Sequence, residues 1–246
     1  MKNVICMKWG DLYNDEYVNK LYHMVKRNTT GPVRFVCLTD NPKNLDSEIE
    51  TYECPSISIK SPENQLGWRK ITLFSDAEYL FGLKGNWLFL DLDVVITSNI
   101  DAFFEYKIDD NFIVMKNWSQ PKKMIGNTSI FRFKIGTSMH LLNELEQNSI
   151  EILDKYPNSQ TYVSENIEKL NFWPDEWCLL FKINCTRNWP LNFILPPKLP
   201  KKSKIVAFPG VPNPHQALKG IWPVKAKWKK IYKYIKPTKW VTEHWR

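Results

Sequence analysis

The first forty residues contain two short apolar runs separated by an amphipathic stretch. Residues 4–7 and 33–38 are almost entirely apolar, which is typical of buried strands. Residues 15–26 lie between them and carry apolar side chains at helical spacing, namely Tyr17, Val18, Leu21, Tyr22 and Val25. The second run stops at the turn cluster 39–42. This order predicts a β-α-β unit, the usual opening of a nucleotide-binding α/β sheet.

The next apolar stretches lead to a pair of carboxylates. Residues 68–81 carry apolar side chains at helical spacing, and Gly82 and Gly85 end the predicted helix. Residues 87–90 are fully apolar and predict a central strand. This strand runs directly into Asp91-Leu92-Asp93, so the two acidic side chains are expected at its carboxyl end.

The remainder of the chain predicts alternating strands and helices. Strands are expected at 111–115, 127–133 and 205–208, and helices at 137–150, 158–170, 175–181 and 224–235. The last helix would place Val224, Trp228, Ile231 and Ile235 on one face and lysines on the others. We therefore expect an α/β domain with a mixed central sheet flanked by helices over residues 1–222. A basic, aromatic helical extension would follow over residues 223–246, packed on or next to that domain.

Composition places the protein among ordinary globular chains of a reducing compartment. Of its 246 residues, 43% are apolar and 24% charged. The five cysteines lack the close spacing of zinc or redox motifs, which favours free buried thiols. The apolar run at the N-terminus is too short for a signal peptide, and no run approaches the ~20 residues of a membrane span. We expect a cytoplasmic protein, or one on the cytoplasmic face of a membrane.

Asp91 and Asp93 give the strongest chemical signal. Two carboxylates at the end of a buried strand are costly unless a cation or hydrogen bonds compensate them. Ligands bind at that end of the strands in open α/β sheets. Carboxylate oxygens suit Mg²⁺ or Mn²⁺, which would neutralise the charge that develops on a departing diphosphate. A strand-terminating turn with two solvated carboxylates is the structural alternative, and the position after a β-α-β opening favours the metal site.

Several short motifs along the chain, taken in order, resemble those of a known enzyme group. They are YVNKL (17–21), RFVCLTD (34–40), GWRK (67–70), FLDLD (89–93), GNTSIFRF (126–133), FWPDEW (172–177) and FPGVPNPH (208–215). The set resembles GT-A glycosyltransferases of the glycogenin and lipopolysaccharide-galactosyltransferase group, and bacterial and viral glycosyltransferases related to them. The resemblance implies a Rossmann-like GT-A fold. It also implies transfer of a sugar from a nucleotide-diphospho-sugar to a glycan or glycolipid, as in polysaccharide biosynthesis, with retention of the anomeric configuration.

The resemblance also implies roles for individual residues. Asp91 and Asp93 would bind Mn²⁺ or Mg²⁺ and, through it, the donor diphosphate, with a UDP-sugar preferred to a GDP-sugar. Lys70, or Arg69 beside it, would reach the phosphates. The remaining positions would surround the nucleoside (Met7, Lys8, Asp40), the transferred sugar (Asn127, Ser129) and the sugar or acceptor (Asp175, Glu176).

Position 209 departs from the pattern of this group. The late motif commonly reads Phe-His-Gly, and its His is a third metal ligand, whereas this chain has Pro209. His215 is one substitute, either as a ligand or as a phosphate contact. The alternative is that two carboxylates, phosphates and water hold the metal, which Mg²⁺ tolerates well, and we favour it.

Several of these residues are also compatible with a purely structural role. Lys70 is compatible with a solvated helix position, and Asn127 with the start of a strand. Asp175 is compatible with the first turn of a helix, where the dipole stabilises an acid. Trp68 and Trp173 are expected in the core rather than as stacking platforms.

Two other functional classes remain open at this point. In a haloacid-dehalogenase-like phosphohydrolase, Asp91 would be the nucleophile, although that motif normally ends the first strand. A degenerate transferase that only binds glycans is compatible with Pro209. Basic patches with interleaved aromatic residues are compatible with binding of single-stranded nucleic acid. No nucleic-acid motif is present, however, and we expect no such partner.

The basic segment 225–236 is compatible with two arrangements. It would lie on an anionic bilayer as an amphipathic helix, which suits a lipid-linked acceptor. Alternatively, Trp228 and Ile231 pack on the main domain while the lysines are solvated, and this is the arrangement we favour. The net charge of +8 is concentrated here, because lysines are frequent and acids rare after Lys198.

Overall fold

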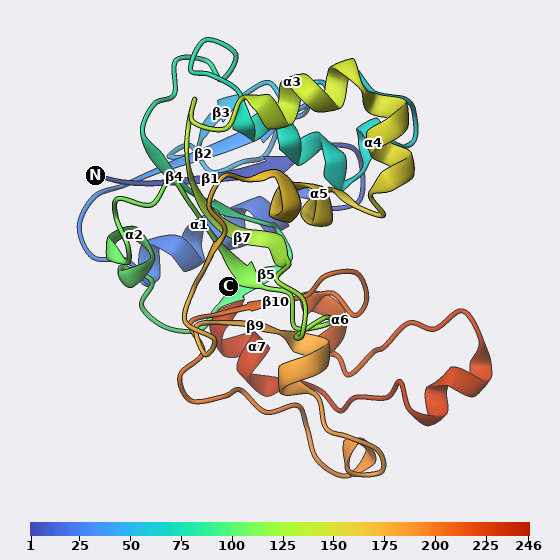
Figure 1. Ribbon diagram of the computed structural model, residues 1–246. Helices are drawn as coiled ribbons and strands as arrows, with labels where there is room; N and C mark the ends of the chain where they lie inside the picture. The colour runs from blue at the N-terminus through green and yellow to red at the C-terminus, as the bar shows by residue number, and fades with distance from the viewer.

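A seven-stranded mixed sheet forms the centre of the molecule, shown in Figure 1 as a computed structural model that describes residues 1–246. The strand order is β3-β2-β1-β4-β7-β6-β8. The bounds are β1 (Lys2–Lys8), β2 (Val33–Thr39), β3 (Glu50–Tyr52), β4 (Asn86–Leu90), β6 (Phe112–Lys116), β7 (Gly126–Lys134) and β8 (Asn171–Phe172). Strand β7 runs antiparallel to both β4 and β6, and the other pairs are parallel. The predicted mixed α/β sheet is confirmed.

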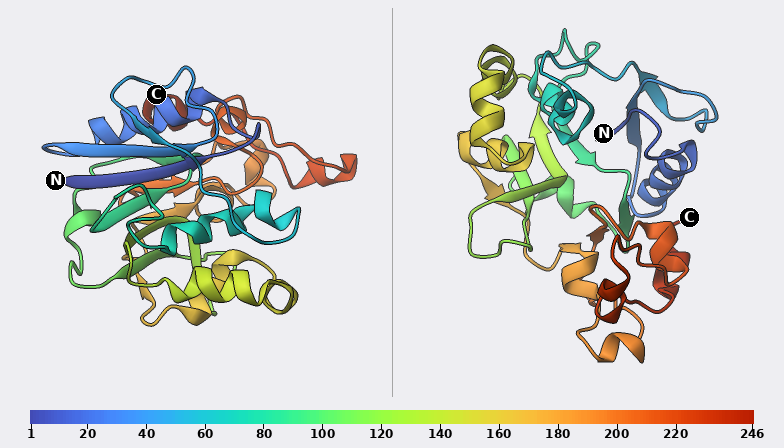
Figure 2. Two further views of the ribbon diagram at one scale, coloured as in Figure 1. Left: turned by 90° about the horizontal axis from the view of Figure 1, so that it is seen from above. Right: turned by 90° about the vertical axis from the view of Figure 1, so that its right-hand side faces the viewer.

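Helices cover both faces of this sheet, as the left panel of Figure 2 shows. Helix α1 (Asp15–Arg27) packs on one face, and on the other lie the 3₁₀ helix η2 (Gly67–Phe74), α3 (His140–Gln147), α4 (Ser149–Lys155) and α5 (Ser159–Asn166). Side chains of a strand alternate between the two faces, so Val4 and Cys6 join the core cluster under α1, whereas Ile5 and Met7 join the other.

A second, three-stranded sheet extends the core beneath α1. It has the order β5-β10-β9 and consists of β5 (Val94–Ile96), β9 (Cys178–Leu180) and β10 (Ile205–Ala207). Two short helices lie beside it in Figure 1, α6 (Pro214–Leu218) and α7 (Lys239–His244). Val241 and Trp245 are buried in the same cluster as α1, so the end of the chain packs on the main body.

Short elements complete the chain. They are α2 (Ala102–Glu105), the 3₁₀ helices η1 (Glu63–Gln65), η4 (Leu191–Phe193) and η5 (Lys227–Ile231), and the π-helical turn η3 (Phe181–Cys185). All five cysteines are free and buried, as the sequence predicts. No helix of the structure is both long enough and apolar enough to cross a membrane.

Four predicted helices of the main domain differ from the structure. The helix expected over 137–150 is divided at Asn148 into α3 and α4. The helix expected over 68–81 is a 3₁₀ helix that ends at Phe74. The helix over 158–170 ends at Asn166, because the chain turns there to form β8. The helix over 175–181 is wrong, since Cys178–Leu180 form β9 and pair with β10. An apolar run of this length is compatible with a helix or with a buried strand. Here it forms a strand because its backbone pairs with β10.

The basic segment also departs from the favoured prediction. Only a 3₁₀ turn, η5, forms within 224–235. Trp228 is 63% exposed and Ile231 62% exposed, so neither side chain packs on the main domain. Of the four apolar side chains expected on one helical face, only Ile235 is buried, so this segment gains little of the tertiary packing that stabilises a helix.

Candidate active site

A cavity of about 610 Å³ opens at the carboxyl ends of β1 and β4. Its walls come from the loop after β1, from η1 and η2, from the segment after β4, from β7, from the start of α5, and from Pro209 and Gly210. Seven of the predicted site residues line it: Met7, Lys8, Lys70, Asp91, Asp93, Asn127 and Ser129. The sheet topology causes this convergence, because parallel strands deliver their carboxyl ends to one edge.

Asp91 is held at this edge by the side chain of Lys70 and by a backbone hydrogen bond. The Lys70 ammonium donates to both carboxylate oxygens of Asp91 at 2.8 Å and to the Thr128 carbonyl at 3.2 Å. The Asp91 amide donates to the Ser129 carbonyl at 2.9 Å, which continues the pairing of β4 with β7. The carboxylate is partly exposed and faces the cavity with its charge compensated.

Asp93 lies deeper and is 6% exposed. The Tyr13 hydroxyl donates to its Oδ2 at 2.9 Å, and the Phe208 amide donates to its backbone carbonyl at 2.9 Å. Burial raises the pKa of the Asp93 carboxyl to about 7, and the nearby charge of Asp91 adds to the shift. An added cation would relieve both effects, so the site is electrostatically prepared for positive charge.

The residues present fit a divalent metal that is shared with phosphate. Asp91 and Asp93 place two carboxylates in the cavity, and no group of three or more His, Cys, Asp or Glu side chains is arranged to hold a metal. Mg²⁺ commonly takes one or two protein carboxylates and completes its shell with substrate phosphates and water. Two carboxylates that line the same cavity meet that requirement.

The loop after β1 forms a second wall. Gly10 has φ +60°, which glycine adopts without strain, and its amide donates to the Asp40 carboxylate at 2.8 Å. Asp40 therefore fixes the loop from behind rather than lining the cavity. Trp9 lines the cavity, and its indole donates to the Gln65 carbonyl at 2.8 Å. Lys8 is buried there, with its ammonium 3.3 Å from Asp15.

Asn127 and Ser129 are buried in the wall formed by β7. The Asn127 Oδ1 accepts from the Ser129 amide at 3.0 Å, which fixes the side chain against its own strand. The amide nitrogen of Asn127 is not used in that bond.

Besides Asp40, four other predicted residues do not line the cavity. Arg69 donates to the Pro55 and Cys54 carbonyls at 2.8 and 2.9 Å. Asp175 and Glu176 are exposed in the turn before β9, and Asp175 lies 3.4 Å from the Lys116 ammonium. The His215 Nδ1 is 2.5 Å from the Tyr17 hydroxyl, and burial, with the charge of Lys219, lowers the pKa of this imidazole.

Lys182 is a cation near the site that the sequence did not single out. Its ammonium donates to the Pro209 carbonyl at 2.5 Å, and Pro209 lines the cavity. Burial lowers the pKa of Lys182, and the positive charge of Lys233 contributes further. Lys182, Tyr13 and Trp9 are separated from the Asp91-Leu92-Asp93 motif by long stretches of chain, so only the folded structure brings them together.

Solved glycosyltransferases share this architecture. The galactosyltransferase LgtC, in complex with donor and acceptor sugar analogs, matches with a TM-score of 0.60 at 10% identity, over 86% of this chain and 88% of that chain. The glycosyltransferase GlyE of Streptococcus pneumoniae TIGR4 matches with a TM-score of 0.56 at 13% identity, over 87% of this chain and 56% of that chain. The WbbM bifunctional glycosyltransferase matches with a TM-score of 0.55 at 12% identity, over 87% of this chain and 46% of that chain.

No protein-family model and no curated protein matches the chain. At 10 to 13% identity, similarity between structures establishes the fold and leaves the activity to be argued from the site. The match to LgtC covers most of both chains, so it extends over the central sheet of this protein. The chain has a GT-A-like glycosyltransferase fold.

Proposed function

We propose that the protein is a glycosyltransferase that moves a sugar from a nucleotide-diphospho-sugar to a glycan or lipid-linked acceptor. The observation that carries this proposal is the placement of Asp91 and Asp93, with Lys70, on a GT-A-like sheet at the wall of a cavity of about 610 Å³. That volume lies within the range of small-molecule sites. The GT-A-like fold, which solved glycosyltransferases share, supports the proposal by analogy.

Asp91 and Asp93 would hold the divalent metal, Mn²⁺ or Mg²⁺. Once bound, the ion supplies Lewis-acid stabilisation of the negative charge on the leaving nucleoside diphosphate. The chain's own residues prepare that site. The Tyr13 hydroxyl orients Asp93, and Lys70 holds the Asp91 carboxylate at the cavity wall. Lys70 lies close enough to exchange its contact with Asp91 for one with a donor phosphate, which strengthens binding of the diphosphate.

The loop after β1 would receive the nucleoside. Met7 and Lys8 form the end of β1, and Trp9 offers an aromatic face in the same wall. Asp40 contributes indirectly, because its bond to the Gly10 amide sets the path of the loop. We propose a UDP-sugar in preference to a GDP-sugar as donor. Apolar and aromatic surfaces with a few fixed polar groups are typical of such pockets.

The transferred sugar would lie beside β7. Asn127 is fixed there through its Oδ1, so its amide group is available to a sugar hydroxyl. Asp175 and Glu176 are exposed to solvent, which leaves them available to an acceptor rather than to the donor. Retention of the anomeric configuration is our proposed stereochemistry, and the anomeric signal in a proton NMR spectrum of the product tests it directly. Cytoplasmic placement is proposed on the five free thiols.

The proposal is tested by a thermal-shift screen of nucleoside diphosphates and sugar nucleotides, with and without Mn²⁺ or Mg²⁺. A ligand that binds only the folded state raises the melting temperature by mass action. We expect a metal-dependent shift with one class of nucleotide, and UDP-type ligands are the first candidates. No shift with UDP- or GDP-type ligands under any metal condition would refute the proposal.

A further inference from the structure

Large apolar side chains are exposed together on two projecting segments. The first is the loop 187–195, which follows η3, and the second is the arm 224–235, which contains η5. The most exposed of their side chains are Trp189, Leu191, Ile194, Trp228, Ile231 and Tyr232, which range from 45 to 66% exposed. We call these two segments the basic apolar surface. Monomeric proteins rarely leave such a set of large side chains uncovered without a function.

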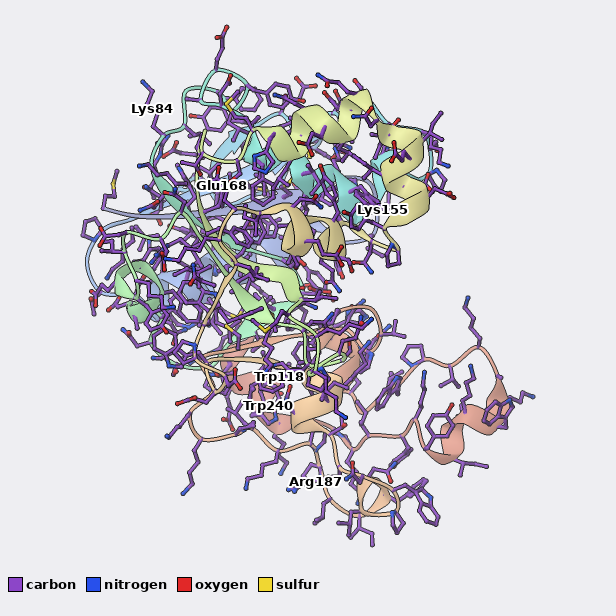
Figure 3. The ribbon with its side chains drawn as sticks, viewed as in Figure 1. Lys84, Trp118, Lys155, Glu168, Arg187 and Trp240 are labelled. Atoms are coloured by element: carbon purple, nitrogen blue, oxygen red, sulfur yellow. The ribbon has the colours of Figure 1, made fainter.

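The loop and the arm are joined to each other. The Asn192 amide nitrogen donates to the Tyr234 carbonyl at 3.1 Å, and the Phe193 and Tyr234 rings stack with centroids 5.0 Å apart. Both segments project at the end of the molecule that carries the small sheet, as Figure 1 and the right panel of Figure 2 show. Figure 3 labels Arg187, where the loop begins. The exposed side chains therefore form one surface rather than two unrelated loops.

The charge of this region has a single sign. No Asp or Glu occurs between Glu176 and Glu243, whereas 13 Lys and one Arg do. Five of those lysines lie within the arm: Lys225, Lys227, Lys229, Lys230 and Lys233. A second copy of the chain would meet this surface with like charge, which disfavours self-association through it. The partner that fits is extended, negatively charged and apolar beneath its surface.

We propose that the basic apolar surface binds an anionic lipid bilayer. Tryptophan and tyrosine favour the boundary between headgroups and acyl chains, and isoleucine and leucine side chains insert below it. Lysines extend their stems along the same boundary and keep their ammonium groups among the lipid phosphates. A regular helix is not required, because the loop and the arm are joined and both expose large apolar side chains.

The surface is connected to the cavity wall. Lys233 of the arm lies close enough to Lys182 to affect its pKa, and Lys182 contacts the Pro209 carbonyl at the cavity. A bilayer bound by the arm would favour an acceptor carried on a lipid. This last step rests on the proposed glycosyltransferase function, whereas binding to the bilayer does not.

Vesicle sedimentation tests the proposal with the full chain. The probes are vesicles of phosphatidylcholine mixed with phosphatidylglycerol, and vesicles of phosphatidylcholine alone. We expect binding to the anionic vesicles, little binding to the neutral ones, and weaker binding as salt rises. The variant Trp228→Ser/Ile231→Ser and the variant Lys229→Gln/Lys230→Gln should each lose binding. Each lysine near an anionic surface contributes roughly fivefold in affinity.

The matched control is Ile150→Ser, which removes a side chain that is 79% exposed on α4 and outside the basic apolar surface. It should bind vesicles as the wild type does. Circular dichroism and melting curves confirm that each variant is folded. Equal vesicle binding by the wild type and the Trp228→Ser/Ile231→Ser variant would overturn the proposal. So would tighter, salt-sensitive binding to a single-stranded oligonucleotide than to the vesicles.

This experiment is independent of the catalytic proposal. Vesicle binding without nucleotide binding would leave the bilayer proposal intact and refute the glycosyltransferase. Nucleotide binding without vesicle binding would refute the bilayer proposal and leave the glycosyltransferase proposal intact.

Discussion

The Lys70 ammonium lies 2.8 Å from both carboxylate oxygens of Asp91. The pair joins η2 to the end of β4 across the cavity wall, and the Thr128 carbonyl holds the same ammonium from β7. This arrangement fixes the Asp91 carboxylate at the sheet edge. It also places a cation where a diphosphate and its metal would bind.

Lys70→Met should weaken binding of the nucleoside diphosphate. Charge-assisted bonds to phosphate are among the stronger polar contacts, so we expect the dissociation constant to rise by about tenfold or more. Calorimetric titration of the nucleotide in saturating Mn²⁺ measures it. Lys84→Met is the control, because Lys84 projects from the edge of the molecule opposite the basic apolar surface (Figure 3). Equal dissociation constants for the wild type and Lys70→Met would exclude a phosphate role for Lys70.

The metal-free protein should lose stability as pH rises from about 4 to about 7. Burial raises the pKa of Asp93 to about 7, against about 4 for an unfolded aspartate. Between these values the folded state holds the proton and the unfolded state has lost it, so the free energy of unfolding falls as pH rises. Asp93→Asn removes this slope and should gain stability over the wild type at pH 8, on the order of 2 kcal/mol.

Urea denaturation in EDTA at a series of pH values measures that slope. Asp175→Asn is the control, since Asp175 is exposed and its substitution should leave the slope unchanged. A wild-type profile that does not fall over this window, or an Asp93→Asn profile that falls as steeply, would contradict the assignment.

Pro209→His should strengthen Mn²⁺ binding. The Phe208 amide donates to the Asp93 carbonyl, which holds the residue before position 209 against the Asp93 backbone. Pro209 itself lines the same cavity as Asp93. An imidazole there adds a third protein ligand, and we expect Mn²⁺ affinity in the presence of the nucleotide to rise about tenfold or more. Electron paramagnetic resonance of free Mn²⁺ gives the affinity. Pro209→Ala controls for loss of the ring, and equal Mn²⁺ affinity in the two variants would be the negative result.

Gly126→Ala should destabilise the wall that carries Asn127. A Cβ at position 126 would lie 2.5 Å from Cγ1 of Val114, and the β-branched valine has little freedom to move away. We expect a loss of about 1–3 kcal/mol in the free energy of unfolding. Val114→Ala removes the obstructing methyl groups, so the double variant should lose less than the sum of the single losses. Additive losses in a urea denaturation cycle would contradict the steric explanation.

Much of the sheet could be predicted from the chain itself. The sequence segments that form β1, β2, β4 and β7 are apolar or alternating. Such short runs indicate buried strands. The placement of Asp91 at the end of β4 followed from the same pattern. Trp68 and Trp173 are buried in the core, as expected.

Other features depended on contacts that no local pattern encodes. Cys178–Leu180 form a strand only because β10 is available for pairing. The bonds from Tyr13 to Asp93 and from Lys182 to Pro209 join residues that lie 80 and 27 positions apart. The exposure of Trp228 could not be predicted either, because helical periodicity indicates packing only where a helix forms, and this segment forms only a short turn.

We propose above that Asp91 and Asp93 bind a metal together with the donor diphosphate. The direct test compares turnover of the sugar nucleotide identified by the thermal-shift screen between the wild type and the Asp91→Ala/Asp93→Ala variant, at equal fold content by circular dichroism. We predict loss of metal-dependent nucleotide binding and of at least about a hundredfold in turnover in the double variant. Undiminished turnover, with metal-dependent nucleotide binding preserved, would contradict the claim.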